Sequence, residues 1–142
     1  MGYKATVKES QHVGFFYVDY EPDIFASRPK VAAVGCRMIN KGIVSDGVYD
    51  ENMQVMFKGL DKLDSGGYLH RAHCQMEVYA VNVRYMIPSD DGMAALSELM
   101  QTIPDEDINN YVLISQKYAE MMHEHGYVFV YDPKITMKEI SQ

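Results

Sequence analysis

The chain has 142 residues, enough for one ordinary domain and too few for two well-separated cores. Hydrophobic residues make up 47% of it and charged residues 23%, a composition that excludes a disordered, collagen-like or coiled-coil protein. Its net charge of −7 disfavours direct binding to nucleic acid, which needs clustered positive charge on the protein.

The N-terminal residues predict two β-strands. Residues 3–8 alternate polar and apolar side chains, a period of two that is typical of an edge strand with one buried face. Residues 12–20 are dense in Val, Phe and Tyr, which favours a second strand buried on both faces. We expect Pro22 to end that strand, because proline cannot donate to a strand ladder.

Residues 27–40 are ambiguous between helix and strand. Apolar residues at positions 31, 34, 38 and 39 follow helical spacing, Ser27 is a possible N-cap and Gly42 a possible end. We therefore predict a helix over this range. The following Asp46-Gly47 pair predicts a tight hairpin between residues 43–44 and 48–49.

A second helix is predicted to begin at Asp50 and to end at Gly66-Gly67. Its apolar stripe consists of Met53, Met56, Phe57, Leu60 and Leu63. Residues 68–86 then favour an extended chain, rich in β-branched and aromatic residues. The apolar residues of this segment lie at even-numbered positions up to Ala80 and at odd-numbered positions after it, so the buried face changes there. This change indicates a bulge or two successive strands.

Two further helices are predicted in the C-terminal half. Ser89 is placed to cap the first, which Pro104 ends, and the second covers residues 105–125. Their expected inward residues are Met93, Leu96, Leu99, Met100 and Ile103 in the first, and Ile108, Tyr111, Ile114, Tyr118, Met121 and Met122 in the second.

The last predicted strand covers residues 127–131, and we expect Asp132-Pro133 to stop it and residues 134–142 to form a tail. No linker or repeat divides the sequence, so residues 1–142 are expected to form one α+β domain. Its sheet would be mixed or mostly antiparallel, with three to four helices packed mainly on one face.

The densest group of reactive residues runs from His70 to Glu77. In a strand, His70 and Cys74 lie about 13 Å apart at ~3.3 Å per residue, too far to share a metal ion, and His73 points to the other face. In a helix they would be neighbours one turn apart and could chelate. Because we favour the strand, we predict no metal site, and no cofactor motif occurs.

Arg71 and Arg84 would reach one sheet face if the parity switch near Ala80 is real. Two guanidinium groups on one face suit a carboxylate or a phosphate, and three nearby residues could stack or hydrogen-bond. These three residues are Tyr79, Asn82 and Tyr85. The alternative is that the arginines pair with surface acids.

Three functions follow from these patterns. The first is a non-enzymatic binding or regulatory protein that acts through an acidic surface or a sheet-face pocket, for example as an inhibitor of another protein. The second is a small-molecule enzyme with His70, His73 and Glu77 as acid-base groups and Arg84 as an anion holder. The third is a protein that sequesters an anionic small molecule. The absence of any complete catalytic motif favours the first.

Location and assembly are also predicted from the sequence. No apolar run reaches the roughly 18 residues of a membrane span, and Cys36 and Cys74 lack the spacing of a disulfide framework. We therefore expect a cytoplasmic protein without membrane contact. The 11 Met and 11 Tyr residues are more than one small core needs, which favours a homo-oligomer.

Overall fold

A computed structural model describes residues 6–9, 15–19, 24–41, 43–56, 58–59 and 76–139 of the chain. Their helices and strands are, in order, β1 Thr6–Glu9, β2 Phe15–Asp19, α1 Ile24–Ser27, β3 Val31–Asn40, β4 Ile43–Asp46, β5 Val48–Tyr49, β6 Met76–Val78, β7 Ala80–Val81, β8 Met86–Pro88, α3 Asp90–Met100, the 3₁₀ helix Asp105–Asp107, α4 Tyr111–Glu124 and β9 Val128–Glu139. The predicted combination of helices with a mixed sheet is therefore confirmed.

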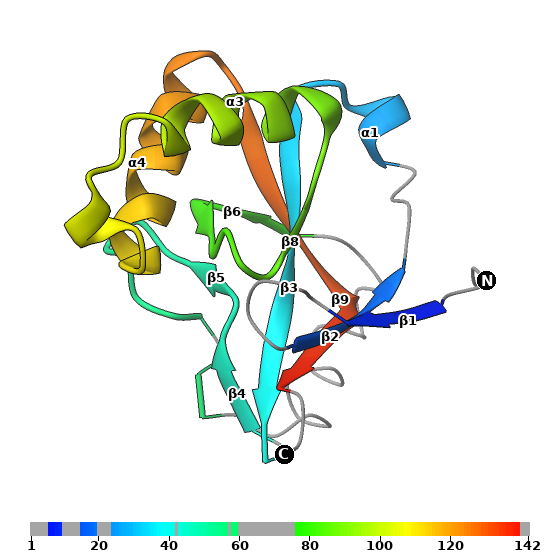
Figure 1. The fold of residues 1–142 in the computed structure, drawn as a ribbon. Coiled ribbons are helices and arrows are strands. Elements are labelled where there is room, and N and C mark those ends of the chain that lie inside the picture. The colour runs from blue at the N-terminus through cyan, green and yellow to red at the C-terminus, as the bar shows by residue number, and fades with distance from the viewer. Residues whose placement is uncertain are drawn as a thin grey trace.

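The two longest strands, β3 and β9, lie side by side and parallel at the centre of the main sheet (Figure 1). Near the start of this pair, β6 adds to β9 and β8 adds to β3, both antiparallel. Near its end, β2 adds to β9 and β4 adds to β3, again antiparallel, and β1 extends β2. Each half of the long pair thus has its own flanking strands.

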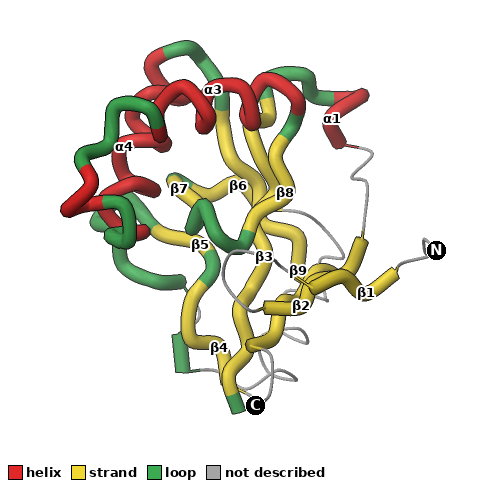
Figure 2. The backbone as a smooth tube through the Cα atoms, viewed as in Figure 1, coloured by secondary structure: helices red, strands yellow, loops and turns green. Residues whose placement is uncertain are grey.

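The side chains of β9 alternate between two cores. Phe129 and Tyr131 belong to a cluster that includes residues of α3 and α4, whereas Val130 belongs to a second cluster with Ile24 of α1. Successive residues of a strand point to opposite faces, so the two clusters cover opposite faces of the sheet. Figure 2 shows α3 and α4 gathered at the end of the sheet that contains β6 and β8.

A small second sheet, formed by β5 and β7, packs closely on β3 at Gly35. A Cβ atom at this glycine would lie 2.5 Å from a methyl carbon of Val48 and 2.6 Å from one of Val81. Only a residue without a side chain allows the two layers to come this close. Position 35 thereby fixes the height of the small sheet above the main one.

The predicted helix over residues 27–40 is wrong, because most of this range is strand β3. Every residue from Val31 to Cys36 is buried, since both faces of the sheet are covered there. A continuous apolar run of this kind contains helical spacings by coincidence. The helix that does form in this region, α1, ends at Ser27, whose hydroxyl donates to the Ile24 carbonyl at 3.3 Å.

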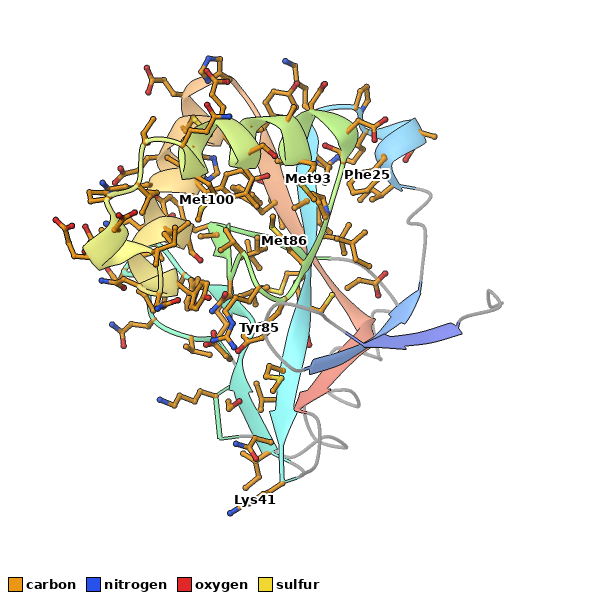
Figure 3. All side chains as sticks on the ribbon, in the orientation of Figure 1. Phe25, Lys41, Tyr85, Met86, Met93 and Met100 are labelled. Atoms are coloured by element: carbon orange, nitrogen blue, oxygen red, sulfur yellow. The ribbon has the colours of Figure 1, made fainter. Side chains whose placement is uncertain are left out.

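The predicted hairpin between residues 43–44 and 48–49 is also wrong. Strand β4 pairs with β3 through a hairpin that has Lys41 at its tip (Figure 3), with a φ of 55°. Strand β5 pairs instead with β7. The Asp46-Gly47 pair does turn the chain, with a φ of 146° at Gly47, but it leads from one sheet to the other.

The helix predicted from Asp50 does not begin there. The Asp50 carboxylate accepts hydrogen bonds from the backbone N–H groups of Asn52 and Gln54, at 2.9 and 3.0 Å. These two bonds close a turn. Met53 has a φ of 60°, and Val55 forms a β-bridge with Tyr49. Three residues of the predicted stripe fall outside the described residues, namely Phe57, Leu60 and Leu63.

The prediction for the C-terminal strand is wrong at its end. Strand β9 continues past Asp132-Pro133 to Glu139. Its register against β3 shifts between Tyr131 and Thr136, so the proline falls in an irregular stretch of the ladder. Proline is tolerated in a strand at such a bulge, where no ladder hydrogen bond is required from it.

Several other predictions are confirmed. Extended segments lie in both predicted N-terminal ranges, where β1 and β2 pair antiparallel. The chain changes strand at Tyr79, between β6 and β7. Ser89 caps α3 by accepting the Gly92 N–H at 3.0 Å. None of the helices in the described part of the chain is long and apolar enough to cross a membrane.

The second C-terminal helix starts later than predicted. Residues 105–107 form a 3₁₀ turn, and α4 begins after Asn110, whose side chain accepts the Leu113 N–H at 3.2 Å. Ile114, Tyr118 and Met122 are buried as predicted. Two expected inward residues are instead exposed, Met93 at 48% and Ile108 at 42%.

Candidate ligand-binding cavity

A cavity of about 510 Å³ lies where β6 gives way to β7, between the turn after β5 and the last part of α4. Its lining residues are Asp50, Glu51, Asn52, Met56, Glu77, Val78, Tyr79 and His123. Glu51, Asn52 and Glu77 are exposed, so the cavity opens to solvent. Its volume lies within the range of small-molecule sites, about 300–1,000 Å³.

Two stacked rings form one part of the lining. The rings of Tyr79 and His123 have their centroids 4.9 Å apart and an angle of 23° between their planes. The Nε2 atom of His123 lies 2.7 Å from the backbone carbonyl oxygen of Tyr79, which only accepts, so Nε2 carries the hydrogen. Phe129 contacts His123 edge-on at 5.6 Å. These contacts fix the imidazole in orientation and tautomer.

Three carboxylates form the other part of the lining. Asp50 is oriented by the two backbone N–H groups that it accepts, Glu51 is exposed, and Glu77 contacts Arg28 at 3.2 Å. Among the described lining residues none is Lys or Arg. The described part of the lining therefore carries negative charge, which favours a positively charged group over an anion.

A separate buried polar cluster lies at the corner between β4 and β5. The Tyr49 hydroxyl donates to Asp46 at 2.9 Å, and the Asn82 side-chain amide donates to the Tyr49 oxygen at 2.8 Å. Burial, with the neighbouring Asp46 charge, raises the pKa of the Tyr49 phenol. The side chains of this cluster bond to one another and to local backbone, which indicates a structural role.

The structure separates the residues that the sequence nominated for ligand binding. Tyr79 lines the cavity, and so does Glu77, nominated as an acid-base group. Asn82, Arg84 and Tyr85 occupy the turn after β7 and do not line it. The Arg84 guanidinium there lies 4.5 Å from the ring centroid of Tyr111 and 5.3 Å from that of Tyr85.

Several nominated residues fall outside the described residues, namely His70, Arg71, His73 and Cys74. Within the part of the chain that is described, no group of three His, Cys, Asp or Glu side chains could hold a metal ion. Cys36 is buried, and burial together with the nearby Asp132 charge raises the pKa of its thiol. A raised pKa keeps the thiol protonated and makes it a poor nucleophile.

Sequence reasoning missed Asp50 and His123 as lining residues. It explained Asp50 as a helix cap and placed His123 within the predicted helix over residues 105–125. The contact that defines the role of His123 joins it to Tyr79 across 44 positions of sequence. No local pattern carries that information, although an aromatic residue at the break between two strands was a feature visible in the sequence.

Comparisons with protein-family models, with curated proteins and with solved structures found no significant match to this chain. A functional assignment therefore depends on the chemistry of its own side chains. The acidic cavity beside the Tyr79–His123 pair is the arrangement with the clearest chemical preference. That preference is for a cation.

Proposed function

We propose that this protein is a non-enzymatic binding protein that receives a cationic group of its partner in the acidic cavity. The observation that carries the proposal is the presence of three carboxylates beside the stacked Tyr79 and His123 rings in one concavity. Carboxylates form strong charge-assisted hydrogen bonds with ammonium and guanidinium groups, and aromatic rings attract the same groups through their π electrons.

The charge of the whole chain supports a basic partner. A net charge of −7 attracts positively charged molecules over long range and raises their rate of encounter. A basic side chain of a partner protein, or a small organic cation, fits both the cavity and this overall charge. We further propose that the protein acts in the cytoplasm and as a homo-oligomer, as the sequence predicts.

The other two functions have less support. An anionic ligand would meet three carboxylates in the cavity, and Arg84, one of its two proposed arginines, stacks among tyrosines elsewhere. Two of the three proposed acid-base residues, His70 and His73, lie outside the described residues, and the enzymatic alternative stays a prediction.

Calorimetric titration at low salt tests the binding function. The probes are N-acetyl-L-lysine amide and N-acetyl-L-arginine amide, with the uncharged N-acetyl-L-citrulline amide as control. We expect the two cations to bind, with affinity falling as salt is added, and citrulline amide to bind far more weakly. Equal binding of citrulline amide, or no binding of either cation, would reject the function.

A pair of matched variants locates the binding. Glu51→Gln removes one negative charge from the cavity lining, and Glu98→Gln removes one from the exposed surface of α3. We expect the first to weaken cation binding roughly threefold, the size expected for one exposed charge next to the ligand, and the second to leave it nearly unchanged. Equal effects of the two variants would place the binding outside the cavity.

A further inference from the structure

One of the cavity carboxylates contacts a cation of the protein itself. Arg28, which follows α1, places its Nη2 atom 3.2 Å from Oε2 of Glu77, a residue 49 positions away in the sequence. The two side chains are 49% and 56% exposed, and only one nitrogen–oxygen contact joins them. Exposed ion pairs of this kind are weak, so the pair can open at little cost.

Glu77 therefore has two possible partners. Glu77 is a lining residue of the cavity, whereas Arg28 is not, and the Glu77 carboxylate contacts the Arg28 guanidinium. A cation that enters the cavity and contacts Glu77 competes with the Arg28 guanidinium for the same oxygen atoms. The internal ion pair and the ligand complex then exclude each other, at least in part.

The chemistry of the lining favours a guanidinium over an ammonium as the entering group. A guanidinium is planar, stacks on aromatic rings and forms paired hydrogen bonds with carboxylates, whereas an ammonium is a compact and strongly hydrated point charge. The cavity offers both a stacked aromatic pair and carboxylates. Elsewhere in the same chain, a guanidinium already lies over a tyrosine ring, that of Arg84 over Tyr111.

We propose that the cavity binds a guanidinium group and that this group displaces Arg28 from Glu77, so that Arg28 acts as an internal competitor. The inference rests on the proposed function and specifies its ligand. Because the competitor is tethered to the same molecule, it lowers the affinity for the ligand at every ligand concentration.

The test compares Arg28→Ala with Lys30→Ala by the same titrations. Both variants remove one positive charge from the same exposed turn, but Lys30 lies over the Tyr127 ring, 4.4 Å from its centroid, and no contact with Glu77 is found for it. We expect Arg28→Ala to tighten the binding of N-acetyl-L-arginine amide roughly threefold to fourfold, the gain from releasing one weak ion pair. Lys30→Ala should change it by less than about 1.5-fold, since exposed charges are screened.

A double-mutant cycle shows whether the gain comes through Glu77. In a Glu77→Gln background, the added Arg28→Ala substitution should no longer tighten binding, because the competing pair is already absent. Equal gains from Arg28→Ala and Lys30→Ala, or a gain that persists without Glu77, would overturn the competition. Binding of lysine amide as tight as that of arginine amide would overturn the guanidinium preference.

The same data keep the two proposals apart. If no cation binds to the wild-type protein or to Arg28→Ala, both the proposed function and this inference fail. If both cations bind equally and Arg28→Ala has no special effect, the function stands and only the inference fails. Agmatine and a glycine-flanked arginine peptide distinguish the source of the group, and tighter binding of either supports the guanidinium site.

Discussion

The side-chain amide of Asn82 donates a hydrogen bond to the carboxylate of Asp46 at 3.2 Å, although 36 positions separate the two residues in the sequence. The same amide nitrogen donates to the Tyr49 oxygen at 2.8 Å, and the Asn82 side-chain oxygen accepts a hydrogen bond from the backbone N–H of Arg84 at 2.9 Å. One buried asparagine thus joins the corner between β4 and β5 to the turn after β7.

We predict that Asn82→Ala lowers the free energy of unfolding by about 2–3 kcal/mol, because it leaves buried polar groups without this partner. Urea unfolding measures the change. Asn52→Ala is the control, since Asn52 is exposed and its backbone contacts survive the substitution, so it should change stability by less than about 0.5 kcal/mol. Similar losses for the two variants would contradict the role given to Asn82.

Gly92→Ala should destabilise the protein by about 1–3 kcal/mol, although alanine is the better helix former. A Cβ atom at position 92 would collide with the Ala32 carbonyl oxygen of β3 and would lie 2.9 Å from the Tyr118 hydroxyl. Helix α3 would have to move away from the sheet. Ser97→Ala, on the exposed side of the same helix, is expected to be neutral or slightly stabilising in thermal unfolding. An equally neutral Gly92→Ala would show that the helix can shift freely.

Stability should fall steeply at alkaline pH. Burial raises the pKa of Tyr118, and burial with the Asp46 charge raises that of Tyr49, so the folded protein keeps protons that the unfolded chain releases near its ordinary tyrosine pKa of about 10. The contribution of each group is complete below that pH and is lost above it, at about 1.4 kcal/mol per pH unit.

Tyr118→Phe separates this effect from general alkaline damage. The variant loses the hydrogen bond from the Tyr118 hydroxyl to the Gly92 carbonyl oxygen, 2.8 Å long, and should be about 1 kcal/mol less stable at pH 7. Above pH ~10 its stability should fall less steeply than that of the wild type, by about 1.4 kcal/mol per pH unit. Parallel curves of unfolding free energy against pH would disprove the linkage.

The sequence predicted the elements whose determinants are local. Ser89 as the cap of α3, the buried stripe of α4 through Ile114, Tyr118 and Met122, and the break between strands near Ala80 are all confirmed. The helix predicted over residues 27–40 was wrong because the chain there is buried on both faces of the sheet. A strand buried on both faces is apolar throughout, and such a run also contains apolar residues at helical spacing. The helix predicted from Asp50 was wrong because an aspartate side chain accepts hydrogen bonds from following backbone N–H groups both in a turn and at a helix N-cap.

The cavity was predictable only in part. Glu77 was nominated as an acid-base group and Tyr79 as a ligand-binding residue near Arg84, and both line it. Asp50 and His123 come from segments that meet only in the folded chain, and Arg28 reaches Glu77 in the same way. Pairings across tens of residues depend on the strand order, which a single sequence does not reveal.

Strand β9 also determines when the molecule can finish folding. It pairs with β2, β3 and β6, all of which are synthesised before it, and it supplies residues to both cores. During translation the main sheet therefore cannot form completely until residues 128–139 have left the ribosome, because its central strand is missing before then. Such distant pairings slow the search for the native topology, and they expose apolar strand edges to aggregation in the meantime.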